Sequence, residues 1–352
     1  MNRRDFLKSL FYLSSLSLIP STIEAKTQSQ ILAGIFIWAD LHTGQIFSSS
    51  PQINSNGIFP VSRIGSIMKL ISTATLLEEN LISPQKTYEC RGIIKFQGKE
   101  YKCTKAHGKV SLIQALGHSC NVFFAQASQS ISPTLFLDYC SRFGFDRSLY
   151  SQLSPPDPLG RGSLRKFFSL DQLSNVPNQG IIDKSKLDKM QSNFTDFVLG
   201  LHTDSAVNLL HIIQLTSLIA LKGNMPKLFF KHSNSEHSLK PIKLHLSEST
   251  WIGLQNGMKL ACLHGTARKL DPENQFKIAA KTGTIPLVSK NYFSKSSANN
   301  SNQIKEEYFQ SLITGYFPYD NPQYVFCLLA PHGTSQETAV PLAHKEIFSH
   351  KW

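Results

Sequence analysis

The chain has 352 residues, of which 41% are hydrophobic and 17% are charged, and its formal net charge is +12. This length suits one large globular domain with a sizeable core, and six cysteines in such a chain do not make a disulfide scaffold. The basic residues are scattered and form no dense run interleaved with aromatic residues, so the charge does not predict nucleic-acid binding.

The N-terminus has the features of an export signal. Residues 2–8 contain paired arginines followed by Phe-Leu and a lysine, and they resemble the twin-arginine signal. An apolar stretch at 10–20, shorter than the ~20 residues of a spanning helix, precedes a small-residue cleavage site at 23–25. We therefore expect a twin-arginine export signal at 1–25 and a location in the periplasm or on the outer face of the inner membrane. The alternative is a basic N-terminal helix of a cytosolic protein.

Strands are expected near both ends of the remaining chain, 26–352, with helices between them. Short apolar runs and turn residues predict strands at 31–38, 45–47, 276–281, 311–317 and 324–330. A helical pattern begins at Ser66, and 207–221 is the most buried-looking helical segment.

This order predicts an α+β fold. We expect an antiparallel sheet formed by the N- and C-terminal segments and flanked by helices, beside an all-helical subdomain. The α/β part covers about 30–80 and 250–352, and the helical part covers about 81–249. A Ser/Asn/Lys-rich stretch at 289–302 is expected to be a loop.

Ser66 and Lys69 form an S-x-x-K motif at the start of the predicted helix, directly after Gly65. Residues three apart share a helix face, so the lysine amine can lie over the serine hydroxyl and remove its proton. The pattern is common: Ser83 and Ser163 also begin S-x-x-K sequences, and both are expected to lie on solvated polar faces.

Ser119 and Asn121 form an S-x-N motif, in which the serine can relay protons and the amide can hold a substrate carbonyl. Two other S-x-N sequences, at 289–291 and 297–299, make this pattern weak by itself.

The sequence Lys281-Thr282-Gly283-Thr284 occurs once, at the end of an apolar strand. Its lysine and hydroxyl groups can bind a carboxylate, and the glycine lets a substrate backbone approach closely. The backbone amides of Thr284 and Ser66 could together form an oxyanion hole.

The three motifs in this order are the signature of penicillin-binding proteins and serine β-lactamases. The chain resembles the transpeptidase domain of the class B, penicillin-binding protein 2-like members, through these motifs and through the segments at 118–124, 257–258, 265–267 and 315–318. It departs from the family in having Ile285-Pro286 after K-T-G-T, and no pedestal or glycosyltransferase domain is recognisable.

The resemblance implies peptidoglycan D,D-transpeptidation, with stem peptides and β-lactams as ligands, cell-wall synthesis proteins as partners, and no cofactor for the chemistry. It assigns Ser66 as nucleophile, Lys69 as base, Ser119 and Asn121 as relay and substrate-holding groups, and the K-T-G-T residues as the carboxylate site. A D,D-carboxypeptidase is the close alternative. A serine β-lactamase or a non-catalytic β-lactam sensor fits less well, since no Glu-x-x-Leu-Asn element and no further spanning segment is found.

Cys90, Cys103, His107 and Cys120 combine three thiols and one imidazole, the donors of a closed tetrahedral zinc site. They fall where some enzymes resembling penicillin-binding protein 2 carry zinc. A structural zinc, a Cys90–Cys103 disulfide and inert buried thiols remain the alternatives.

Overall fold

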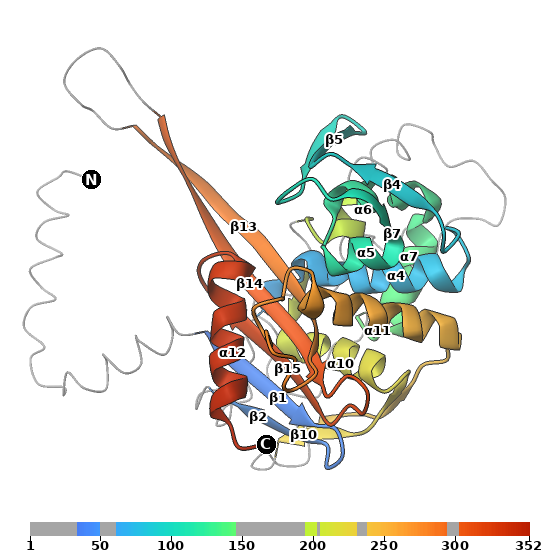
Figure 1. The fold of residues 1–352 in the computed structure, drawn as a ribbon, viewed down its shortest axis with the longest axis vertical. Helices are drawn as coiled ribbons and strands as arrows, with labels where there is room; N and C mark the ends of the chain where they lie inside the picture. Colours follow the sequence, from blue (N-terminus) through green and yellow to red (C-terminus); the bar gives the residue numbers. More distant parts are fainter. Residues whose placement is uncertain (1–33, 50–60, 146–193, 203–204, 231–237, 294–302) are drawn as a thin grey trace, which may run out of the picture. The chain divides into compact units, whose positions relative to one another are not determined.

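The computed structural model of the protein describes residues 34–49, 61–145, 194–202, 205–230, 238–293 and 303–352 (Figure 1). The predicted export signal at 1–25 lies outside these residues, as do the S-x-x-K beginning at Ser163 and the S-x-N at 297–299.

The segment Gly34–Trp352 is built around one sheet with the strand order β11-β10-β2-β1-β15-β14-β13. These strands are β1 (Ile35–Asp40), β2 (Gln45–Ser48), β10 (Leu228–Phe230), β11 (Ser238–Leu239), β13 (Ala279–Phe293), β14 (Gln303–Phe317) and β15 (Tyr324–Ala330). Neighbouring strands are antiparallel, except that β10 runs parallel to β2. Strand β1 pairs with β15, which places Ile37 opposite Cys327. Segments from the two ends of the chain therefore form the centre of the sheet, as the sequence predicts.

Successive side chains of a strand point to opposite faces of the sheet, and each face has its own core. Phe36 and Leu328, an opposed pair, pack in one cluster with Val340 and Ile347 of α12 (Val340–Ser349). The neighbouring pair, Ile37 and Cys327, belongs to the other cluster, which includes α10 (Leu209–Ala220). Helices thus cover both faces of the sheet (Figure 1).

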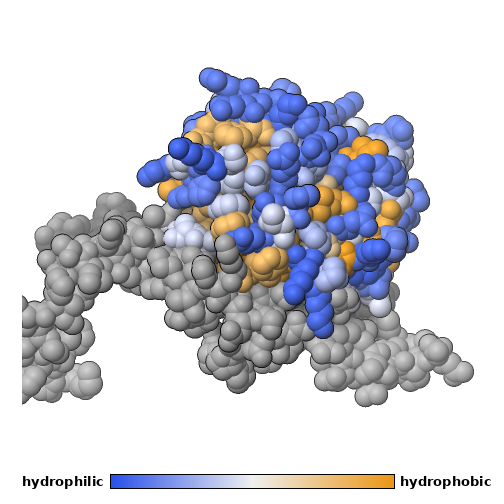
Figure 2. Space-filling view, turned by 90° about the horizontal axis from the view of Figure 1, so that it is seen from below, coloured by the Kyte–Doolittle hydropathy of each residue, from blue (hydrophilic) through white to orange (hydrophobic). Residues whose placement is uncertain are grey.

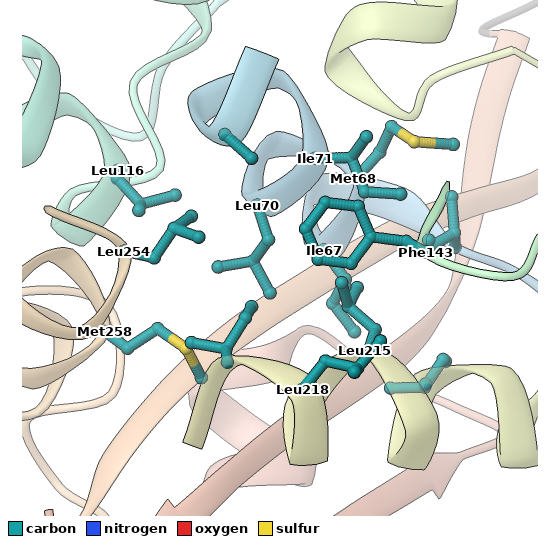
Figure 3. Packing of buried hydrophobic residues seen from close by; sticks show 14 of the residues in the cluster. Ile67, Met68, Leu70, Ile71, Leu116, Phe143, Leu215, Leu218, Leu254 and Met258 are labelled. Atoms are coloured by element: carbon teal, nitrogen blue, oxygen red, sulfur yellow. The ribbon is translucent and has the colours of Figure 1, made fainter. Parts of the chain in front are cut away.

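The larger core surrounds the segment that begins at the nucleophile candidate. A single 3₁₀ turn (Gly65–Met68) leads into α4 (Lys69–Glu78). The further helices of this part are α5 (Leu112–Gly117), α6 (Asn121–Ala127), α7 (Pro133–Arg142) and α11 (Glu248–Leu263). Figure 3 shows Ile67 and Leu70 among side chains from α10 and α11, such as Leu218 and Met258, and all four are fully buried. This packing holds the start of α4 rigidly, and with it Ser66 and Lys69.

The α+β class is confirmed, but strands occur where only helices were expected. The range 81–249 contains the antiparallel pairs of β4 (Thr87–Cys90) with β7 (Gly108–Ser111), of β5 (Ile93–Phe96) with β6 (Lys99–Lys102), and of β9 (Asn224–Met225) with β12 (Ile242–Lys243). Strands β10 and β11, also in this range, extend the central sheet at one edge. The sheet is therefore mixed and is not formed by the terminal segments alone. Strand β13 also continues to Phe293, into the stretch expected to be a loop.

In the part of the chain that the structure describes, no helix is both long and apolar enough to cross a membrane. On the face shown in Figure 2, hydrophobic residues gather in small separate patches among hydrophilic ones.

Candidate active site

Ser66 is held in place by the glycine before it and by strand β13. Gly65 has φ +57°, in the left-handed region that favours glycine, and a Cβ there would lie 2.9 Å from Cγ1 of Ile285. On the same strand, a Cβ at Gly283 would lie 3.6 Å from the backbone nitrogen of Ser66. Gly65 thus allows the K-T-G strand to lie directly against the nucleophile turn, whereas a Cβ at Gly283 would make only ordinary contact with it.

Lys69 lies beside Ser66, as the S-x-x-K spacing predicts. Its Nζ donates hydrogen bonds to Ser66 Oγ at 3.1 Å, to Asn121 Oδ1 at 2.5 Å and to the backbone oxygen of Ser119 at 2.9 Å. The side chain is completely buried, and burial lowers the pKa of Lys69 to about 8, although the nearby thiols of Cys103 and Cys120 oppose the shift. A sizeable neutral fraction near neutral pH makes Lys69 a competent base for Ser66.

Ser119 lies between two lysines. Its Oγ accepts a hydrogen bond from Lys281 Nζ at 2.9 Å and a longer one from Lys69 Nζ at 3.4 Å. Its φ of +53° is uncommon for a residue with a side chain, and such conformations cluster at functional sites. The hydroxyl is therefore placed to pass a proton between the two amines.

Asn121 is the first residue of α6, where its amide reaches both the base and a neighbouring loop. Its Oδ1 accepts from Lys69, and its Nδ2 donates to the backbone oxygen of Lys102 at 2.6 Å. A carboxamide nitrogen has two N–H donors, so one remains for a substrate carbonyl.

The K-T-G-T residues line the other side of the site. Lys281 is fully buried, and burial together with the charge of Lys69 lowers its pKa well below the usual lysine value. The hydroxyl of Thr282 donates to Thr266 Oγ1 at 2.6 Å, and the hydroxyl of Thr284 is 2.8 Å from Ser335 Oγ. The sequence motifs do not single out Thr266 or Ser335 as partners of this strand.

All of these groups meet at one cavity of about 380 Å³. The motif residues that line it are Ser66, Ser119, Asn121, Thr282 and Thr284. Lys69 and Lys281 lie directly behind them and reach the cavity through their hydrogen bonds to Ser66 and Ser119. The alternative S-x-x-K serine, Ser83, is outside this cavity, and its hydroxyl donates to Gln85 on the surface.

The sequence model of the penicillin binding protein transpeptidase domain matches residues 56–349. The chain belongs to this family. The match covers all three motifs, and the structure brings together the S-x-x-K serine and lysine, the S-x-N residues and the K-T-G strand.

Known members of the penicillin-binding protein family are distant in sequence but share the fold. The peptidoglycan D,D-transpeptidase MrdA of Haemophilus influenzae is 22% identical over 304 residues, which cover 83% of this chain and 44% of MrdA. The chain thus spans less than half the length of this relative. Penicillin-binding protein 2 of Helicobacter pylori superposes with a TM-score of 0.63 at 18% identity, over 94% of this chain and 62% of that one. The transpeptidase domain of penicillin-binding protein 3 from Burkholderia pseudomallei superposes with a TM-score of 0.61 at 16% identity. The match covers 94% of this chain and 93% of that one.

The cysteine–histidine set of this transpeptidase domain comes together beside the S-x-N motif. The sulfur of Cys103 lies 3.8 Å from that of Cys90 and 3.7 Å from that of Cys120, and Nδ1 of His107 lies 3.3 Å from Cys90 Sγ. All four ligand atoms lie within 4.8 Å of one another. Zinc bound to thiolates at about 2.3 Å in a tetrahedron places the sulfurs roughly 3.8 Å apart, so this arrangement fits the metal.

The environment of these thiols favours the thiolate form at one of them, Cys103. The hydrogen bond with Cys120 lowers the pKa of Cys103, while the same contact raises that of Cys120. The thiolate is the form of cysteine that binds metal, and a lowered pKa favours this form. None of the six cysteines forms a disulfide, and Cys140, Cys262 and Cys327 are buried elsewhere, as expected of core residues.

Proposed function

We propose that this chain is the catalytic domain of a peptidoglycan D,D-transpeptidase that works through an acyl-enzyme on Ser66. The observation that carries the proposal is the single network in which Lys69 bonds Ser66 and Ser119, and Lys281 bonds the same Ser119 hydroxyl. The network thus places the base, the nucleophile and the relay next to the carboxylate-binding strand, around one cavity.

The first half-reaction forms the ester. Neutral Lys69 accepts the proton of Ser66 as Oγ attacks the carbonyl between the two D-alanines of a stem peptide. The backbone amides of Ser66 and Thr284 stabilise the oxyanion. The C–N bond then breaks, and the proton passes from Lys69 through Ser119 to the departing amine of D-alanine. The carboxylate of that D-alanine is bound by the Lys281 amine and the Thr282 and Thr284 hydroxyls.

The second half-reaction releases the enzyme. An amine from a neighbouring stem attacks the ester carbonyl, the C–O bond to Ser66 breaks, and the proton of the amine returns to Ser66 Oγ. Water as the acceptor would give a D,D-carboxypeptidase with the same residues. β-Lactams would acylate Ser66 because their strained amide imitates the D-alanyl-D-alanine bond, and the acyl group would remain on the serine.

The experiment that tests this function is turnover of a stem peptide ending in D-alanyl-D-alanine, with and without an added amine acceptor. The wild-type domain should release D-alanine and form the cross-linked product, and Ser66→Ala should do neither. Release of D-alanine with no cross-linked product at any acceptor concentration would show a carboxypeptidase. No release at all would contradict both assignments.

A structural zinc bound by Cys90, Cys103, His107 and Cys120 is part of this proposal. Cys120 lies between Ser119 and Asn121, and the carbonyl of Lys102, next to Cys103, accepts from Asn121. The metal would fix this backbone and take no part in the acyl transfer itself.

Twin-arginine export to the periplasm is likewise proposed, from the sequence at 2–8. A peptidoglycan-polymerising protein is the proposed partner. A similar chain comes from a peptidoglycan synthase complex that coordinates polymerization and crosslinking. It superposes with a TM-score of 0.60 at 19% identity, over 89% of this chain and 55% of that one.

A further inference from the structure

A second cavity, of about 230 Å³, adjoins the active-site cavity and is lined by basic side chains. Its cations are Lys105, Arg268 and Lys269, and three histidines, His107, His118 and His264, also line it. No carboxylate contributes to its lining within the described chain. Lys105, Arg268 and Lys269 also form no ion pair with any described residue, although the adjoining cavity has one carboxylate, that of Glu337. Such a cavity attracts an anionic ligand.

The two cavities adjoin and share four lining residues. Thr104, His118, Thr266 and Gln336 line both of them. Thr266 accepts the hydrogen bond of Thr282, one of the proposed carboxylate-binding hydroxyls. The basic cavity therefore begins next to the place where the carboxylate of the leaving D-alanine is bound.

The chemistry of transpeptidation assigns an occupant to that place. The acceptor amine attacks the same carbonyl from which the first amine departed, so by microscopic reversibility it arrives along the path of the leaving D-alanine. The rest of the acceptor must then extend beyond the K-T-G strand, toward the basic cavity. Stem peptides are carboxylate-bearing chains, and this cavity offers them several cations.

We propose that the basic cavity is the binding site for the acyl-acceptor, a peptide amine whose own carboxylates bind Lys105 and Arg268. This assignment rests on the proposed transpeptidase function and names the substrate of its second step. The cavity would favour an anionic amine over water at the acyl-enzyme. The three permanent cations carry the recognition, with His264 as a further hydrogen-bonding group.

Equilibrium binding of γ-D-glutamyl-D-lysine tests the assignment. The unacylated protein is used, because an opened penicillin keeps its own leaving amine in the path of the acceptor, and the affinity for the dipeptide is compared with that for its diamide. The dicarboxylate should bind at least about tenfold more tightly, the size expected of two partly exposed ion pairs. The double variant Lys105→Glu/Arg268→Glu should lose this preference. The matched variant Lys240→Glu/Lys345→Glu, which makes the same charge change at exposed positions away from both cavities, should keep it.

Three results would overturn the assignment. The first is equal affinity for the dipeptide and its diamide, and the second is a preference that survives in Lys105→Glu/Arg268→Glu. The third is inorganic phosphate binding as tightly as the dipeptide, which would show a general anion site. Failure of the proposed function appears separately, as the absence of a penicillin adduct in the intact mass. The dipeptide comparison does not depend on acylation, so it still decides whether the cavity binds a carboxylated amine.

Discussion

Nζ of Lys281 lies 2.9 Å from Oγ of Ser119, although the two residues are 162 positions apart in the chain. This bond joins the K-T-G strand to the S-x-N motif, and Lys69 joins both to Ser66. The site is therefore one hydrogen-bonded network, and each member can be removed to measure its part.

Ser119→Ala should slow acylation by benzylpenicillin by roughly 10²-fold or more, because it removes the relay between the two amines. The substitution keeps the Cβ and so does not change the strain of the left-handed backbone. Stopped-flow acylation rates measure the effect. Ser111→Ala is the matched control, since it deletes the hydroxyl that caps α5 and should cost about 1 kcal/mol of stability without slowing acylation. Equal rates for wild type and Ser119→Ala would remove Ser119 from the mechanism.

Lys69→Ala should reduce the acylation rate by at least ~10²-fold, the usual contribution of a general base. Lys69→Met fills the buried volume better than Lys69→Ala. It should therefore be acylated as slowly as Lys69→Ala but have a higher free energy of unfolding. In the wild type the rate should rise from pH 6.5, reach half its maximum at about pH 8 and level off above that, because only the neutral amine accepts a proton and burial lowers the pKa of Lys69 to about 8. A pH-independent rate over this range, or a variant that acylates normally, would mean that another group activates Ser66.

The purified domain should contain about one zinc per chain, as closed structural sites do, when it is prepared with reductant and without chelator. Removing the metal, or Cys103→Ser, should lower the melting temperature and slow acylation ~10-fold, because the ligands fix the backbone around Ser119 and Asn121. Cys140→Ser, at a buried thiol outside the cluster, should retain the metal. Elemental analysis checks the content. Two results would refute the zinc site. One is metal-free protein with a Cys90–Cys103 disulfide, and the other is metal-free, fully active protein in which the four candidate ligands are all unlinked.

Arg3→Lys combined with Arg4→Lys should leave the precursor in the cytoplasm, because the paired arginines are the recognised element of the twin-arginine signal. Cell fractionation and immunoblotting measure the distribution. Lys8→Arg, which keeps the charge outside the pair, is the control. Normal export of the double variant would indicate the general secretory route.

The sequence predicts the site far better than the details of the sheet. Ser66, Lys69 and the K-T-G strand follow from motifs whose spacing has a direct geometric meaning, and the structure places them as expected. The contacts of Thr282 with Thr266 and of Thr284 with Ser335 depend on how loops fold against β13. No local pattern encodes such contacts.

The strands that the sequence does not predict also depend on contacts between distant segments. Strand β10 has only three residues and joins the sheet through parallel pairing with β2, so neither its length nor its periodicity signals a strand. The polar stretch after residue 288 was expected to be a loop from its composition, yet Ser289 pairs with Glu307 in an extended two-stranded ribbon. Pairing of backbone groups does not need the apolar side chains on which the sequence argument relied.

The central claim is tested most directly by the intact mass of the full-length domain after exposure to benzylpenicillin. The wild type should gain the mass of one penicillin molecule, and peptide mapping should place it on Ser66. Ser83→Ala should label like the wild type, since that serine lies on the surface outside the cavity. Ser66→Ala should not label at all, and an adduct that survives in Ser66→Ala would contradict the account.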